Sequence, residues 1–136
     1  MAEFSKSSKE KLDTCHEELR RLFLAVSKYY DCTILCGHRS KAEQDDAVRT
    51  GHSKLAWPNS KHNSLPSKAI DVVPFPIDWK TKERFYHFSG FVLGIAKLLD
   101  IKVRWGGDWN NNLNFNDETF TDLPHFELIG DKDANA

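Results

Sequence analysis

The chain has 136 residues, a length that suits one domain around one hydrophobic core. Apolar residues make up 40% of it and charged residues 29%, as in ordinary soluble proteins. Lys and Arg number 19 against 20 Asp and Glu, so the net charge of -1 gives no electrostatic case for nucleic acid or an anionic membrane as the main partner.

The N-terminal segment 1–11 is polar and has no apolar h-region, so we expect no secretory signal. The longest apolar stretch, around 91–99, is interrupted by a glycine and a lysine and is too short to span a bilayer. We therefore expect no membrane insertion. A chain that is made and kept in the cytoplasm favours free thiols at its three cysteines, Cys15, Cys32 and Cys36.

The first quarter of the chain predicts one helix and one strand. Apolar residues recur at helical spacing over about 8–29, where Ser7 and Glu10 fit a capping box at the helix start. The run Cys32–Cys36 is short, apolar and β-branched, which predicts a buried strand.

A second capping box begins at Ser40 and predicts a short helix over about 41–50, with Gly51 as its stop. The following segment, 52–68, has little periodicity and reads as a long loop that carries His62. Long loops in compact domains are often functional.

The second half of the chain alternates short strands with one long helix. In order, we expect a strand over 69–73, a helix over 81–99, a strand over 102–105, a polar loop over 110–121, a strand over 125–129 and a flexible tail over 131–136. No repeat, linker or regular βαβ alternation is visible. The sequence therefore predicts a single α+β domain, 1–136, with about three helices packed on a small, mainly antiparallel sheet.

Four polar residues form a pattern typical of a catalytic metal site. His62, Asp71 and His125 supply two imidazoles and one carboxylate, and three protein ligands with an open position are typical of catalytic zinc. Asp122 lies three residues before His125 and would serve as the base for a zinc-activated water. Asp71 lies in an apolar strand, where an ionised carboxylate is costly unless it is paired or bound to metal. A lone histidine, by contrast, is more often a surface residue or a hydrogen-bonded one.

Four motifs together resemble a known family, the zinc D-Ala-D-Ala peptidase clan or M15 peptidases. Ser60-Lys61-His62 followed by Ala69-Ile70-Asp71 resembles its S-x-H…A-x-D signature, and Asp122-Leu123-Pro124-His125 resembles its E/D-x-x-H motif. Gly37-His38-Arg39-Ser40 resembles G-x-R-S, and Trp105-Gly106-Gly107-Asp108-Trp109 resembles W-G-G-x-W. The motifs occur in the family order over about 33–128. They are most similar to the branch of small phage endolysins that act as L-alanyl-D-glutamate peptidases.

Two departures from the family pattern are visible. The segment between His62 and Asp71 is one residue longer than is common in the family and contains a proline. The acid before the last histidine is Asp122 rather than Glu, and its shorter side chain has less reach. The endolysin branch commonly has Asp at this position, so the second departure also indicates that branch.

The resemblance implies a hedgehog/DD-peptidase-like fold and roles for five further residues. Arg39 would be a second positive donor to the oxyanion, and its alternative role is a surface salt bridge with Glu43. Ser60, Trp109 and Trp105 would contact substrate, although Trp105 also fits the core. Glu127 would point to the same side of its strand as His125 and would orient that ligand, or would simply be a paired strand acid.

The resemblance also implies an activity and a setting. The expected enzyme is a zinc metallopeptidase that cleaves the L-Ala–D-Glu bond of the peptidoglycan stem peptide. It would be a monomeric endolysin without a separate wall-binding domain, made in the host cytoplasm and acting on the wall in the periplasm after holin-assisted release. Two alternatives stay open: a D-Ala-D-Ala carboxypeptidase or dipeptidase of the same clan, and a non-catalytic zinc-binding wall module. Asp122 argues against the module, because a structural site needs no base.

Overall fold

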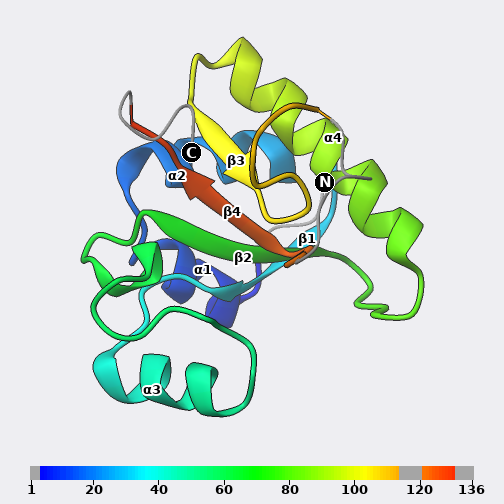
Figure 1. The fold of residues 1–136 in the computed structure, drawn as a ribbon. Coiled ribbons are helices and arrows are strands. Elements are labelled where there is room, and N and C mark those ends of the chain that lie inside the picture. Colours follow the sequence, from blue (N-terminus) through cyan, green and yellow to red (C-terminus); the bar gives the residue numbers. More distant parts are fainter. Residues whose placement is uncertain (1–3, 114–120, 131–136) are drawn as a thin grey trace.

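A computed structural model describes residues 4–113 and 121–130 (Figure 1). The predicted flexible tail and residues 114–120 of the predicted polar loop lie outside the described residues. The helices and strands follow in chain order as α1 (Lys6–Leu12), α2 (Glu17–Ser27), β1 (Cys32–Cys36), α3 (Lys41–Arg49), the 3-10 helix η1 (Lys61–Asn63), β2 (Ala69–Pro74), α4 (Lys82–Leu98), β3 (Val103–Trp105) and β4 (His125–Leu128).

The four strands form one antiparallel sheet in the order β1-β2-β4-β3. Among the described strands, the last one, β4, therefore lies inside the sheet, between β2 and the short strand β3. Its register places Asp71 opposite His125, and β3 places Arg104 opposite Glu127. Sheet pairing thus brings together polar residues that are far apart in the sequence.

The two faces of the sheet have different partners because successive strand residues point to opposite sides. Ile70, Val72 and Phe126 belong to the hydrophobic core with apolar residues of α1, α2 and α4. These three helices cover that face, whereas α3, teal at the bottom of Figure 1, lies beside the sheet. Asp71 and His125, which alternate with the core residues, project from the opposite face. The predicted α+β class and antiparallel sheet are confirmed.

The prediction of one helix over 8–29 is wrong, because the segment forms two helices. The cap of α1 is Ser5, which accepts from the amide of Ser8, so the predicted Ser7 capping box does not start the helix. Between the helices the backbone bonds to a distant segment: His16 N donates to Ser67 O at 2.8 Å, and Ser67 N donates to Thr14 O at 2.8 Å. The side chain of His16 then caps α2. The apolar periodicity predicted one continuous helix, but at Thr14–His16 the backbone forms hydrogen bonds to Ser67 in place of helical ones.

The other predicted elements are found within a residue or two of their predicted ends. The capping box of Ser40 and Glu43 starts α3, and Gly51 follows it with a φ of +83°. The long loop before β2 contains the short helix η1, which the sequence analysis did not predict. Among the described residues, no helix has the length and hydropathy needed to cross a membrane.

Candidate active site

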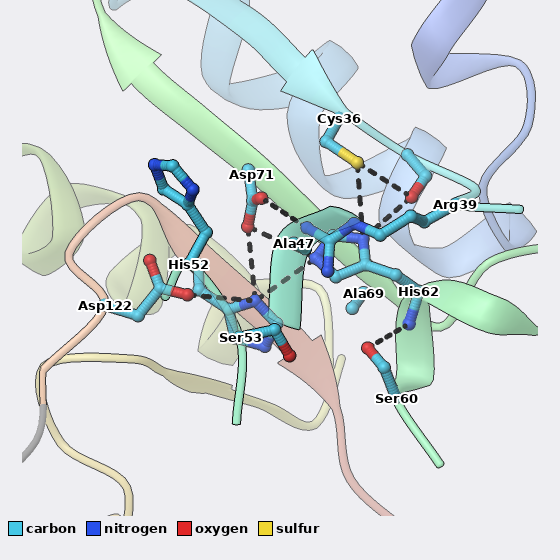
Figure 2. Close-up of polar contacts among 12 residues, drawn as sticks. Cys36, Arg39, Ala47, His52, Ser53, Ser60, His62, Ala69, Asp71 and Asp122 are labelled. Atoms are coloured by element: carbon cyan, nitrogen blue, oxygen red, sulfur yellow. Dashed lines mark hydrogen bonds and ion pairs between the residues drawn. The ribbon is translucent and has the colours of Figure 1, made fainter. Parts of the chain in front are cut away.

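Three of the predicted ligands meet on the open face of the sheet. Oδ1 of Asp71 lies 3.3 Å from Nε2 of His62 (Figure 2). The same oxygen lies 3.2 Å from Nδ1 of His125. The two imidazole nitrogens lie 3.3 Å from each other. Three potential ligand atoms from η1, β2 and β4 therefore converge on one point. The pairing of β2 with β4 brings His125 beside Asp71, which lies 54 residues earlier in the chain.

The imidazole of His62 is held by the backbone around it. Ser60 caps η1 by accepting from the His62 amide at 3.2 Å, which makes Ser60 a structural residue as well as a cleft-lining one. The Nδ1–H of His62 donates to the carbonyl oxygen of Gly37 at 2.7 Å, so Nε2 is the nitrogen directed at Asp71. The thiol of Cys36 lies 3.8 Å from the same Nδ1. In its neutral form His62 is therefore held in the tautomer that leaves Nε2 free to bind a cation.

The imidazole of His125 is held in the same way by a carboxylate. Its Nε2–H donates to Oε1 of Glu127 at 2.7 Å, which leaves Nδ1 for the cluster with Asp71. The second oxygen of Glu127 lies 3.0 Å from both Nε and Nη2 of Arg104 and 3.3 Å from Nζ of Lys61. Glu127 thus lies beside His125, as strand alternation predicts. Arg104 and Lys61, for which the sequence predicted no role, hold it there.

The cluster strongly perturbs the pKa of its members. Burial alone would raise the pKa of Asp71. The two histidines have a larger effect in the opposite direction, and the pKa of Asp71 therefore lies well below its ordinary value. Burial works to lower the pKa of His62, and Asp71 more than offsets it and raises that pKa to about 10. For His125 burial is likewise overcome by hydrogen bonds to Asp71 and Glu127, and its pKa rises to about 9. The cluster therefore behaves as a carboxylate that attracts cations, whether protons or a metal.

Asp122 lies at the edge of this cluster, with Oδ2 3.9 Å from Nδ1 of His125. Its backbone is fixed by Gly106: the Asp122 amide donates to Gly106 O at 2.8 Å, and a Cβ on Gly106 would lie 2.1 Å from Asp122 O. The close approach that Gly106 permits is thus to the protein's own backbone, whereas Gly107 leaves room for the ring of Trp105. Burial, followed by the charge of Asp71, raises the pKa of the Asp122 carboxyl.

Arg39 faces the cluster rather than the surface. Its Nη2 lies 3.5 Å from Oδ2 of Asp71, and its Nη1 donates to Oε1 of Gln44 at 3.0 Å. The Glu43 side chain, the alternative partner, instead accepts from the amide of Ser40 in the capping box. The guanidinium is therefore a positive group beside the three potential ligands.

The two tryptophans of the W-G-G-x-W segment lie in different places. The ring of Trp109 lies 5.2 Å from that of His125 and forms part of the cleft wall, with the guanidinium of Arg104 5.9 Å from its centroid. Trp105 is only 4% exposed and packs in the core, where its Nε1 donates to Leu123 O at 2.7 Å. The expected substrate contact by Trp105 is thus corrected to a core position, because odd and even residues of β3 face opposite sides.

The cluster opens into a cleft of about 360 Å³ that contains most of the expected site residues. Besides the residues above, its lining includes His52 and Leu55 from the loop after α3. His52 therefore lines the cleft, whereas Nδ1 of His38 bonds to the carbonyl oxygen of Ser64. Clefts with convergent polar groups and perturbed pKa values are the usual location of active sites. Among the described residues, two groups that share Asp71 could hold a metal ion: one adds Cys36 and His62, and the other adds Asp122 and His125. Together they contain the three predicted ligands, whose imidazole and carboxylate donors suit a metal ion.

Comparisons with known proteins agree with this geometry. The family described as phage L-alanyl-D-glutamate peptidase matches residues 1–129. The L-alanyl-D-glutamate peptidase of Escherichia phage T5 is 33% identical over 135 residues, which cover 93% of this chain and 97% of that protein. The crystal structure of the Serratia marcescens L-Ala D-Glu endopeptidase ChiX is similar, with a TM-score of 0.74 and 30% identity over 93% of this chain and 89% of that one. The chain belongs to the phage L-alanyl-D-glutamate peptidase family.

Proposed function

We propose that this protein is a zinc-dependent peptidase that hydrolyses the L-Ala–D-Glu bond of the peptidoglycan stem peptide. Membership of the family and the activities for which two relatives are named support the bond and the substrate. All of the proposed site residues come from one chain, and we propose that the protein acts as a monomer. Its substrate is in the cell wall, and we propose that it acts in the periplasm after release assisted by a holin.

The observation that carries the zinc proposal is the spacing of the three potential ligand atoms. His62 Nε2, His125 Nδ1 and Asp71 Oδ1 lie 3.2 to 3.3 Å apart. Ligands about 2.0–2.1 Å from a tetrahedral zinc ion are separated by about 3.3–3.4 Å. The three atoms thus form one face of a tetrahedron of the right size, and the cleft gives access to the fourth corner. A structural site would instead be closed by a fourth protein ligand.

The residues around this face have separate roles in the proposed reaction. Zinc, when bound, supplies a Lewis acid that activates a water molecule and polarises the scissile carbonyl. Asp122 accepts the proton of the attacking water and passes it to the leaving amine. Arg39 donates hydrogen bonds to the oxygen on which negative charge develops. Trp109 forms one wall of the cleft, and Glu127 keeps His125 in the tautomer in which Nδ1 can bind metal.

Mass spectrometry of purified Gram-negative peptidoglycan tests the proposal. The protein is incubated with it as purified, after chelation, and after chelation with zinc restored. We expect stem peptides that begin at D-Glu, and new L-Ala ends on the glycan, only when zinc is present. Release of D-Ala alone would indicate the carboxypeptidase alternative. Intact peptidoglycan with zinc still bound would indicate a binding module.

A further inference from the structure

Gln44 is a buried polar side chain on a helix that is otherwise largely exposed. It is 0% exposed, and with Ala47 it is one of the two buried residues of α3. Its amide group lies between the candidate active site and the loop after α3. A fully satisfied buried amide fixes the groups around it, whereas a partly satisfied one is costly.

The oxygen of this amide bonds to the catalytic side of the cleft. Oε1 of Gln44 accepts from Nη1 of Arg39 at 3.0 Å and from Nδ2 of Asn63 at 3.1 Å. Asn63 in turn accepts from the amide of Ser60 at 3.1 Å, inside the η1 helix that carries His62. The guanidinium of Arg39 is thus held by Gln44 through one nitrogen and faces Asp71 with the other, at 3.5 Å.

The nitrogen of the same amide bonds to the opposite wall of the cleft. Nε2 of Gln44 donates to Oγ of Ser53 at 2.9 Å and to the carbonyl oxygen of Leu55 at 2.5 Å. Both residues belong to the segment 52–55, which lines the cleft. The amides of His52 and Ser53 also donate to Ala47 O, so this segment is anchored on α3. One side chain therefore connects the guanidinium to the cleft wall.

We propose that Gln44 is a positioning residue that holds the guanidinium of Arg39 in its catalytic orientation and fixes the 52–55 wall of the cleft. The inference rests on the proposed function, in which Arg39 stabilises developing negative charge. The amide has one orientation in this network, since its oxygen meets only donors and its nitrogen only acceptors. A rotation of the guanidinium away from Asp71 would disturb its hydrogen bond to Oε1 of Gln44.

The first test is a double-mutant cycle of Gln44→Met with Arg39→Ala, measured on the stem peptide. Methionine has a similar volume but cannot form the four hydrogen bonds. We expect Gln44→Met to lower kcat about 10- to 100-fold, the loss typical of a misplaced catalytic group, with zinc content unchanged. In the Arg39→Ala background the same substitution should lower kcat little further, because the residue that it positions is gone. Equal losses in both backgrounds, or no loss in the first, would overturn the proposal.

A second variant separates the two halves of the network. Ser53→Ala removes one acceptor on the wall and leaves the bond between Gln44 and Arg39, so it should raise KM and leave kcat close to that of the unchanged protein. A kcat loss in Ser53→Ala as large as that in Gln44→Met would contradict the division of roles. Ser8→Ala is the matched control for a lost buried hydrogen bond, since Ser8 Oγ accepts from Ile34 N at 3.0 Å on α1, outside the cleft.

Hydrogen exchange of the zinc-free protein gives a readout that does not depend on activity. The amides of residues 52–55 should exchange faster in Gln44→Met than in the unchanged protein, and Ser8→Ala should not have this effect. Unchanged exchange at 52–55 would overturn the wall-fixing role. If the wild-type protein releases no product, that result counts against the proposed function. The exchange rates of residues 52–55 would still test whether Gln44 fixes the cleft wall.

Discussion

The carboxylate of Glu127 accepts a hydrogen bond from Nε2 of His125 at 2.7 Å, and this contact decides which nitrogen of that ring faces Asp71. The contact is possible because the two residues are two positions apart on β4 and point to the same side of the sheet. Glu127 itself is ion-paired with Arg104 from the neighbouring strand. The orientation of one proposed ligand therefore depends on the register of β3 with β4.

We expect Glu127→Ala to lower zinc affinity about 10- to 100-fold, the usual loss when the partner of a ligand histidine is removed. Glu127→Gln keeps an acceptor for His125 and should lose less. Competition titration of the zinc-free variants with a chromophoric chelator measures both affinities. If the two variants lose affinity equally, the charge of Glu127 matters rather than its hydrogen bond to the ring.

Replacing Asp122 with Asn should separate catalysis from metal binding. Asparagine fills the same space but cannot accept a proton, so kcat should fall about 10²- to 10⁴-fold. Zinc content should stay the same, because Asp122 lies 3.9 Å from Nδ1 of His125 and is not one of the three close atoms. Metal analysis and turnover on the same sample test this. Loss of zinc in proportion to activity would make Asp122 a ligand instead of a base.

Zinc binding should release protons and strengthen as pH rises. In the zinc-free protein His62 and His125 have pKa values raised to about 10 and about 9, so both are protonated at pH 7. Zinc binds neutral imidazole, so about two protons should leave on binding, and affinity should increase up to about 100-fold per pH unit at neutral pH. The rise should level off as pH passes through the two raised pKa values.

Calorimetric titration at pH 7 in buffers of different ionisation enthalpy counts these protons. His87→Gln is a suitable control, since the His87 ring bonds to Tyr30 OH at 2.8 Å and lies outside the cleft lining. This control should release the same number as the unchanged protein. Release of less than one proton would mean that Asp71 does not hold the histidines charged.

Two of the three cysteines should resist alkylation while the protein is folded. Burial raises the pKa of Cys15 and of Cys32 from 9.0 to about 12 in each case. At pH 8 the reactive thiolate should therefore be about a thousandfold rarer at these positions than in the unfolded chain. Mass spectrometry after timed iodoacetamide labelling, with and without denaturant, measures the difference. Rapid labelling of Cys15 without denaturant would contradict its burial.

Much of the architecture could be predicted from the sequence because local signals were strong. The capping box at Ser40 and the stop at Gly51 predicted the two ends of α3. The apolar run around Asp71 predicted β2. The break between α1 and α2 could not be predicted in this way, because it depends on hydrogen bonds between Thr14–His16 and a residue about fifty positions later.

For the candidate site too, features that depend on nearby residues could be predicted from the sequence, whereas features that depend on strand pairing could not. Motif spacing singled out the residues that now meet around Asp71, and strand alternation placed Glu127 beside His125. The sequence could not predict the role of Arg104, because that role depends on the pairing of β3 with β4. It also could not decide between a substrate contact and a core position for Trp105, because that depends on which side of the strand faces the core. The burial of Gln44 was indicated only weakly by the sequence, through its position three residues before the apolar Ala47 in the predicted helix.

The position of β4 between β2 and β3 determines when, during synthesis and folding, this protein can first bind zinc. Every other strand of the described residues precedes β4, yet β3 has its only described strand partner in β4, and β4 itself supplies His125. A nascent chain that has not yet produced β4 would thus have an incomplete sheet and two of the three proposed metal ligands. We expect the ability to hold zinc, and with it any hydrolysis, to arise in a single late step of folding.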